Sequence, residues 1–466
     1  MAWFRNGILA GSVMALAACA SSSEHVMRPT PRPLGSEYAA LSIPPGLIAN
    51  GAETESTRRS ELVLPVAEKV ATSPDEPQGA LSLREALALA LLRSPELATF
   101  SYDTRAAEAR TLQAGFRPNP EMSLLSEDFG GNRQWGGFQQ AQTTLALSQT
   151  IELGAKRTHR LRLARLDESL AAWDFETKRL DVFVEVTKAF VGTLVAQRKV
   201  DIAADTLRIE QQFFGAVADR VRAGKVSPIE QQRADVSLAN GRIILEKAKR
   251  ELSIARDKLA SFWGSREARF AKVEGDLNNI VPPPPLERLT ALAAQNPDLA
   301  RWETEIQQRE ARLAVERSKE IPDLTIQGGV RKYGVGGTAF VAGIGMPLPV
   351  FGTNRGNIGD AQAQLSKGLA QQRATEVRIT TAIRESYTQL AAAYEEATTL
   401  RRDVLPAADA AFNGTSVGYR NGKFGLLEVL DARRSQTEAQ NRLLDALSAY
   451  QAASAETERL TGQSLR

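Results

Sequence analysis

One stretch constrains the fold of this chain most strongly: residues Glu152 to Arg222 run for roughly 70 residues without a proline. Within it, apolar or β-branched residues recur at alternating steps of four and three, the heptad pattern of a helix that packs against other helices along its length. They are Leu166, Leu170, Trp173, Thr177, Leu180, Val184, Thr187, Val191 and Leu194. At about 1.5 Å per residue this helix would be roughly 100 Å long, which predicts an elongated molecule. A shorter proline-free stretch returns between Gly352 and Leu405.

The first nineteen residues predict export and a lipid anchor. Arg5 forms a short basic region, and residues 7–18 form an apolar segment too short for a permanent transmembrane helix. The segment ends in Leu16-Ala17-Ala18-Cys19, which resembles the bacterial pattern for cleavage before a cysteine that is then acylated. We therefore interpret residues 1–18 as a lipoprotein signal peptide and residues 19–80, rich in Ser and Pro, as a lipid-anchored tether. An ordinary signal peptide with a chance cysteine is the alternative.

Composition excludes several classes of function. The net charge is only +3 and no basic run tracks phosphates, so we expect no nucleic-acid partner. Cys19 is the only cysteine and the two histidines, His25 and His159, lie far apart, which excludes a disulfide framework and a Cys/His metal cage. No nucleophile motif, phosphate-binding loop or paired acid–base cluster stands out, so we expect neither an enzyme nor a cofactor.

A helix and a β-hairpin precede the long helix. Ser82 and Glu85 form a capping box that starts a helix running to about Phe116, before two prolines. Residues 121–129 and 139–151 are predicted as strands, because apolar and small or polar residues alternate in the second of them. The glycine-rich residues 130–137 form the turn between them. Strands of about ten residues have the length that a tilted strand needs to cross a bilayer.

The long helix ends in a tight turn. Gly224 supplies a left-handed C′ residue after Arg222, and Ser227, Pro228 and Glu230 then take the N-cap, N1 and N3 positions of a new helix. The two helices therefore fold back as an antiparallel hairpin with an exposed tip. The return helix runs to about Trp263, and a run of four prolines, residues 282–285, closes the unit.

The whole pattern occurs twice. Pro120-Glu121 returns as Pro322-Asp323, 202 residues later. Residues 154–157 return as 352–355, and Arg222-Ala223-Gly224-Lys225 returns as Arg420-Asn421-Gly422-Lys423, both 198 residues later. The change in offset lies in the β-hairpin region, as expected of a structural duplication. We therefore divide the chain into a first repeat, residues 81–285, and a second repeat, residues 286–466.

The second hairpin also alternates, with Phe340, Ala342, Ile344 and Met346 on one face and small residues on the other. This pattern suits lipid on one side and a lumen on the other, although alternation alone would equally suit a half-buried soluble sheet. Four strands cannot close a barrel, and an open sheet edge is not tolerated in lipid. Several chains must then share one barrel; three would supply twelve strands, but the residues do not fix that number.

The repeated architecture resembles the TolC-like outer membrane factors over about residues 80 to 462. The segment from Leu147 to Arg157, at the junction of strand and helix, is similar to the heavy-metal-efflux, CzcC/CusC-like branch of that family. The same is true of Pro118-Asn119-Pro120-Glu121, which leads into residues 127–131. The resemblance implies a mainly α fold with a transmembrane β part: a duplicated helix–β-hairpin–long-helix–helix unit. Three copies would form a twelve-stranded outer-membrane β-barrel, continued by an α-helical tunnel in the periplasm.

The resemblance also implies partners for a homotrimer held in outer-membrane lipid. The helical tips would face a periplasmic adaptor, a membrane fusion protein that is itself bound to an inner-membrane pump of the RND type. The residues that fall at the tips are Arg222, Gly224, Lys225, Arg420, Gly422 and Lys423. Their alternative role is plain turn chemistry, with a glycine at the cap and cations at a helix C-terminus.

A periplasmic gate is the second site that the resemblance implies. Glu428 and Asp431 are three residues apart and so share one helix face. Repeated by symmetry, they would form a ring of like charges at the narrow end of the tunnel, favouring cations. Glu428 has an alternative role at the N3 position of its helix, as Glu230 has in the first repeat. Arg233 occupies the position equivalent to Asp431, which makes Asp431 the better candidate for the gate.

We expect this chain to be a passive exit duct, lipid-anchored in the outer membrane with most of its residues in the periplasm. Metal cations are the expected cargo, on the evidence of the junction motif. The mature chain has only scattered methionines, Met27, Met122 and Met346, so selection would lie in the pump and adaptor. Efflux of drugs or organic solutes is the alternative cargo, and a periplasmic coiled-coil scaffold without a pore is the alternative class.

Overall fold

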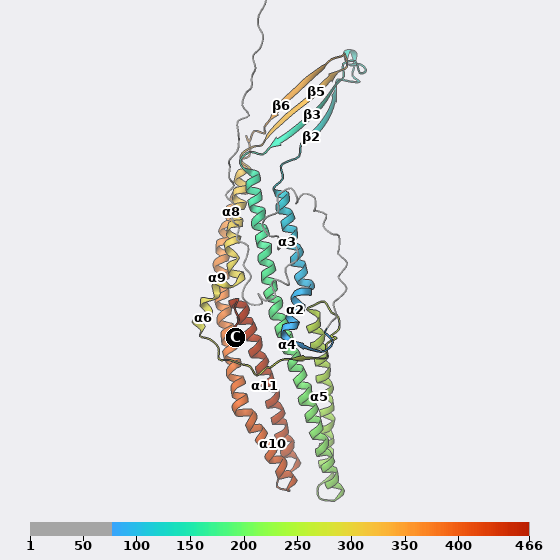
Figure 1. Cartoon of the computed structure of the whole chain (residues 1–466), viewed down its shortest axis with the longest axis vertical. Coiled ribbons are helices and arrows are strands. Elements are labelled where there is room, and N and C mark those ends of the chain that lie inside the picture. The colour runs from blue at the N-terminus through green and yellow to red at the C-terminus, as the bar shows by residue number, and fades with distance from the viewer. Residues whose placement is uncertain (1–76, 466) are drawn as a thin grey trace, which may run out of the picture.

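The computed structural model describes residues 77–465. The signal peptide, Cys19 and nearly all of the proposed tether therefore lie outside the described residues. The described part is elongated, with a four-stranded sheet at one end and two helical tips at the other (Figure 1). None of the helices within residues 77–465 is long and apolar enough to cross a membrane.

The first repeat contains α2 (Leu83–Arg93), α3 (Pro95–Ala114), β2 (Glu121–Glu127), β3 (Gln142–Ile151), α4 (Lys156–Arg222) and α5 (Pro228–Ser261). Ser82 caps α2 in the predicted box, donating its backbone N–H to Glu85 Oε2 at 2.9 Å. The prediction of one helix from Ser82 to Phe116 is wrong at Ser94. This residue ends α2 and caps α3, and Pro95 has no N–H with which to continue the first helix.

The second repeat contains α8 (Trp302–Ser318), β5 (Leu324–Tyr333), β6 (Thr338–Gly345), α9 (Arg355–Thr399), the π-helix η5 (Leu400–Val404), α10 (Leu405–Arg420) and α11 (Leu426–Thr461). The second repeat begins with two short helices, α6 (Leu286–Ala291) and α7 (Pro297–Ala300). Two single 3₁₀ turns are also present, η3 (Arg133–Trp135) in the first repeat and η4 (Ala293–Gln295) in the second. The second long helix thus passes through Pro406 instead of ending before it, by way of one widened turn.

The four long strands form one antiparallel sheet in the order β2-β3-β5-β6. The hairpins therefore lie side by side, and β3 pairs with β5 from Gln142–Tyr333 to Ile151–Leu324. The strand registers place most of the apolar side chains on one face of the sheet. On this face side chains such as Met122 (76% exposed) and Phe340 (93%) are accessible to solvent. Polar and small residues occupy the other face: Ser123, Thr144, Ser148, Gln327, Arg331 and Gly343. This alternation confirms the predicted strands.

A second, two-stranded sheet was not expected from the sequence. β1 (Ala80–Ser82) pairs in parallel with β4 (Lys272–Glu274). Each strand has three residues, too few to show alternation. Leu81 and Val273 from this sheet are buried in the main core, which joins it to α2, α4, α5 and α11.

The predicted heptad seam of α4 forms much of the interior. Six of its nine residues are buried: Leu166, Trp173, Val184, Val191, Leu180 and Leu194. The other three, Leu170, Thr177 and Thr187, are half-buried. Near the tips a separate core joins α4 and α5 to α10 and α11 through Val217, Phe412 and Tyr419, among others. The seam prediction is therefore confirmed.

The structure corrects the alignment of the two repeats at the start of the long helices. Ala155 caps α4 and Asn354 caps α9, and both residues are left-handed, with φ of 57° and 56°. Lys156 and Arg355 are thus the equivalent first residues of the two helices. The sequence-based match of residues 154–157 to 352–355 is therefore wrong by one residue, because local identity of Gly and Arg outweighed the backbone conformation.

Candidate functional site

The two helical tips have the same backbone. Gly224 and Gly422 are left-handed, with φ of 67° and 74°. In the first tip the N–H of Lys225 donates to the carbonyl of Arg220 at 2.9 Å, and in the second Lys423 donates to Gly418 at 2.8 Å. These are the bonds of a Schellman turn, and they confirm the turn chemistry predicted for both glycines.

The tips present cations and apolar side chains to solvent. The four cations of the tips are all exposed: Arg222, Lys225, Arg420 and Lys423. Of these four, Arg222 alone forms an ion pair within residues 77–465, with Asp219. Phe424 (48% exposed) and Leu427 (60%) lie beside the second tip, and Ile229 (55%) beside the first. A surface of this composition, at the far end of the molecule from the sheet, suits a protein partner with an apolar and acidic contact surface.

Aromatic contacts join α4 to α10 next to the tips. Tyr419 of α10 is almost fully buried, and the guanidinium of Arg220 from α4 lies 4.6 Å from the centre of its ring. The ring of Phe213, also from α4, is 6.1 Å from Tyr419 and 6.5 Å from Phe412. The first and second hairpins are thus packed against each other directly behind the turns.

The predicted gate residues lie one turn apart on α11. Glu428 is the third residue of the helix after the cap Gly425, so its predicted N3 position is confirmed. Asp431 follows on the same face, and both carboxylates are exposed while Val429 between them is fully buried. In the described part of the chain neither carboxylate has an ion-pair partner.

A buried polar network that begins two residues after Asp431 on α11 was missed from the sequence. Arg433 is only 7% exposed; it donates to Thr206 Oγ1 of α4 at 3.0 Å, and its guanidinium lies over the ring of Phe412. Gln436 bonds Asp409 of α10 at 2.7 Å. A detectable signal existed: Leu426, Val429, Arg433 and Gln436 are spaced by three, four and three residues, as in a heptad seam. Arg433 and Gln436 thus occupy positions that are usually apolar.

Glu210 completes this network from α4. It accepts a hydrogen bond from Ser237 of α5 at 3.0 Å. Burial raises the pKa of the Glu210 carboxyl, while the Ser237 bond and the charge of Arg433 oppose that rise. Helices α4, α5, α10 and α11 are therefore joined by polar groups just behind the exposed carboxylates of α11.

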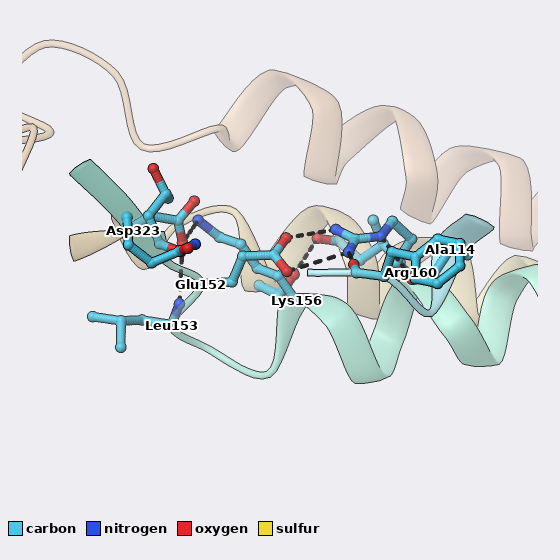
Figure 2. Close-up of polar contacts among 11 residues, drawn as sticks. Ala114, Glu152, Leu153, Lys156, Arg160 and Asp323 are labelled. Carbon is cyan, nitrogen blue, oxygen red and sulfur yellow. Dashed lines mark hydrogen bonds and ion pairs between the residues drawn. The ribbon is translucent and has the colours of Figure 1, made fainter. Parts of the chain in front are cut away.

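A second polar cluster fastens the sheet to the helices (Figure 2). Asp323, just before β5, accepts from Lys156 Nζ at 2.7 Å and from the backbone N–H of Leu153 at 3.1 Å. Arg160 of α4 makes two bonds to Glu152, at 2.6 and 3.2 Å, and also donates to the carbonyl of Ala114. The cluster ties the β3–α4 junction of the first repeat to the start of the second hairpin.

Metal-binding chemistry is not concentrated anywhere in the described residues. Residues 77–465 contain no group of three or more His, Cys, Asp or Glu side chains that could hold a metal ion. On the polar face of the sheet, Arg331 is balanced by Thr144 at 2.9 Å, Gln142 at 3.0 Å and Glu127 at 3.8 Å.

Comparisons with known proteins agree with this architecture. Residues 86–265 and 289–463 match the family model described as outer membrane efflux protein. The chain is 33% identical over 382 residues to the cobalt-zinc-cadmium resistance protein CzcC of Cupriavidus metallidurans, an alignment that spans 82% of this chain and 90% of CzcC. It is 24% identical over 319 residues to the nickel-cobalt-cadmium resistance protein NccC of Alcaligenes xylosoxydans xylosoxydans (68% and 71% of the two chains).

A solved structure has the same fold at low sequence identity. The outer membrane protein VceC of Vibrio cholerae aligns with a TM-score of 0.69 and 17% identity, over 82% of this chain and 97% of VceC. The two matched ranges of the family model fall on the two repeats, each with its β-hairpin and long helix. The chain therefore belongs to the outer membrane efflux protein family, the TolC-like outer membrane factors, and its relatives CzcC and NccC place it with the metal-resistance members.

Proposed function

We propose that this chain is the outer-membrane exit duct of a tripartite efflux system, conducting metal cations passively as a homotrimer. The observation that carries the proposal is the sheet: four strands with one apolar, solvent-exposed face and two unpaired edges, mounted on helical hairpins. A continuous exposed apolar face of this kind is expected where a protein contacts lipid. Twelve strands from three copies would close a barrel with the polar face inside, and the helices would continue it as a tunnel.

The metal cargo rests on the relatives. CzcC and NccC are resistance proteins for cobalt, cadmium and either zinc or nickel, and a chain similar to them over most of its length is expected to serve the same class of ion. The absence of a metal-binding cluster from residues 77–465 supports passive conduction, with selection left to the pump. Lipid anchoring at Cys19 remains a prediction from the sequence; incorporation of labelled fatty acid, lost in Cys19→Ala, tests it.

Growth of a deletion strain separates the possible cargoes. Loss of the gene should increase sensitivity to cobalt, zinc or cadmium salts, and a plasmid copy should restore resistance. Sensitivity to a panel of drugs alone would replace metal ions by organic solutes as the cargo. A deletion strain with no phenotype, together with a protein that carries no current in planar bilayers, would favour the scaffold interpretation.

Adaptor docking is proposed for the tips. The double variant Lys225→Glu and Lys423→Glu should greatly reduce cross-linking to the adaptor, because it reverses the two exposed charges that follow the tip glycines. The matched control is Lys247→Glu with Lys249→Glu, two exposed lysines in the middle of α5. Equal cross-linking in both double variants would remove the docking assignment from these lysines.

The gate is proposed at Asp431, with Glu428 beside it. Asp431→Ala should lower the preference for cations and change single-channel conductance, because it removes three like charges from the narrow end of a trimer. Glu438→Ala, an exposed carboxylate two turns further along α11, is the control and should leave the current unchanged. Indistinguishable currents from Asp431→Ala and the unsubstituted channel would exclude a charged gate at this position.

A further inference from the structure

Two edges of the sheet are left without partners. In the described chain β2 pairs only with β3, and β6 pairs only with β5. Directly after β6 the chain exposes Met346 (49%), Leu348 (73%), Val350 (77%) and Phe351 (103%). An exposed apolar run beside an open edge is expected to be covered by another strand.

The duplication supplies a template for that strand, because the chain contains one contact between hairpins. In it, Gln149 of β3 lies opposite Ile326 of β5, and Ile151 lies opposite Leu324. The same hairpin-to-hairpin contact can form again between the free edge of the second hairpin and the free edge of the first hairpin in another copy. Such a head-to-tail contact closes into a ring.

The register of this second contact follows from the pairs within each hairpin. Leu124 is equivalent to Ile326, 202 residues later. Leu124 pairs with Leu145 and Ile326 pairs with Ile344, so Leu145 is equivalent to Ile344. The step between the second strands is thus 199 residues, the step that also separates the left-handed caps Ala155 and Asn354.

Applying these steps turns the internal pairs into pairs between copies. Gln149 becomes Leu348 and Ile326 becomes Leu124, so Leu348 is placed opposite Leu124 of a second copy. By the same steps Val350 is placed opposite Met122. Leu124 and Met122 lie on the apolar face, and Leu348 and Val350 would continue that face by alternation from Ile344. Leu124 (71%) and Met122 (76%) are as exposed as Leu348 and Val350, which they would meet. A slip of one residue would instead put apolar side chains opposite the polar face.

The junction cluster provides an independent check on the same alignment. Within one chain Lys156, the first residue of α4, is ion-paired with Asp323 at 2.7 Å. The residue equivalent to Lys156 is Arg355, the first residue of α9, and the residue equivalent to Asp323 is Glu121, the first residue of β2. Both are exposed, and in residues 77–465 neither has an ion-pair partner. The two free edges therefore carry unpaired charges of opposite sign at positions where the internal contact has an ion pair.

We infer that the contact between copies repeats the contact between the two halves of one chain, with Leu348 opposite Leu124 and Arg355 paired with Glu121. The partner is a second copy of this chain, and the exposed run from Met346 to Val350 is the surface that its β2 strand covers. Pro347 and Pro349 donate no hydrogen bond, so the intervening residues supply the amides of the ladder. The inference rests on the proposed oligomeric barrel and specifies its closing seam.

Disulfide trapping tests the register in the full-length chain. The double variant L124C/L348C, oxidised in isolated membranes, should give dimers and trimers on a heated gel that disappear after reduction. M122C/L348C and S126C/L348C, each displaced by two residues, should give much less of both species. The single variants L124C and L348C control for chance collisions. L147C/G328C, an opposed pair within one chain, should form its disulfide without any band above the monomer.

A charge exchange tests the ion pair without cysteines. Glu121→Lys and Arg355→Glu should each lower the temperature at which the oligomer dissociates in detergent, and the double variant should restore most of that loss. Asp323→Lys should also lower the stability of the protein, but Arg355→Glu should not restore it, because the partner of Asp323 is Lys156 of the same chain.

The outcomes separate this inference from the proposed function. Preferential trapping by a displaced pair, or no rescue by the double charge exchange, would overturn the register while leaving an oligomeric duct in place. A protein that is monomeric in native membranes, and that forms no cross-link in any register, would overturn the register together with the barrel and hence the proposed duct.

Discussion

The two helical hairpins end in the same turn but reach it differently. In the first, α4 is a single helix of 67 residues. In the second, α9 and α10 are separated by the π-helical turn at Leu400–Val404, and Pro406 stands two residues after Val404. Pro406 has no N–H to donate back into the preceding turn, and a widened turn is the usual way in which a helix accommodates such a loss. The tips beyond are nevertheless almost identical.

The difference shows which part of the duplicated unit was free to change. Leu400 and Ala397 belong to the main core, whereas Phe412 and Tyr419 belong to the core at the tips, so the widened turn lies between two packed regions. The second helical hairpin therefore contains an interrupted helix, α9–α10, whereas the corresponding helix of the first, α4, is continuous. We expect the second tip to bend more easily, restrained chiefly by the buried contacts of Arg433.

The largest effect is expected from copying the proline into the first hairpin. Arg208 stands sixteen residues before Gly224, as Pro406 stands sixteen before Gly422. Arg208→Pro should destabilise the protein by about 3 kcal/mol, because no widened turn is present there to absorb the ring. Its exposed ion pair with Asp205 contributes little, so Arg208→Ala is the control. Similar thermal unfolding of the two variants would show that α4 bends as readily as α9–α10.

The tip glycines should respond equally in the two hairpins. Gly224→Ala and Gly422→Ala should each cost about 1 kcal/mol, since an added methyl group meets no atom within 4 Å and only the left-handed backbone is penalised. Gly414→Ala, inside α10 and equally unhindered, should instead stabilise by about 0.5–1 kcal/mol. Hydrogen exchange of the tip amides measures both. A cost confined to one tip would mean that the turns are not equivalent.

The smallest effect concerns the contact between the hairpins. Since burial raises the pKa of Glu210, its ionised form costs stability at neutral pH, and that cost disappears as the pH falls through the folded pKa. Glu210→Gln should therefore melt slightly above the unsubstituted protein at pH 7, with the difference shrinking toward pH 4.5. Glu246→Gln should change the melting temperature at pH 7 in the opposite direction, melting slightly below the unsubstituted protein, because the hydrogen bond from Lys249 lowers the pKa of that exposed carboxyl. A difference for Glu210→Gln that does not vary with pH would contradict the assignment.

Local patterns predicted most of the elements, and long-range contacts explain what was missed. The capping box at Ser82, the turn at Gly224 and the seam through Leu180 each depend on a few neighbouring residues, and each is confirmed. The break at Ser94 also had a local signal, since Pro95 follows it; the error came from letting the capping box decide the length of the helix.

The pairing of β1 with β4 and the ion pair of Lys156 with Asp323 join residues more than 160 positions apart, so no local pattern reports them. The one-residue error in matching the repeats has the same origin. A left-handed cap is occupied by Ala155 in one repeat and by Asn354 in the other, and only the backbone shows that they are equivalent. The charged tip residues and the proposed gate carboxylates are exposed, while their roles in docking and gating stay predictions, because such roles concern contacts outside a single chain.

The length of α4 sets the distance between the sheet and the first tip. Its seam repeats every seven residues, so inserting seven matched residues into each arm of both hairpins would move the tips outward by about 10 Å and leave their orientation nearly unchanged. An insertion of four residues would instead leave the tips rotated by about 40° about the helix axis and misalign the seam. The distance between the sheet and the tips can thus be adjusted in coarse steps, each of two helical turns.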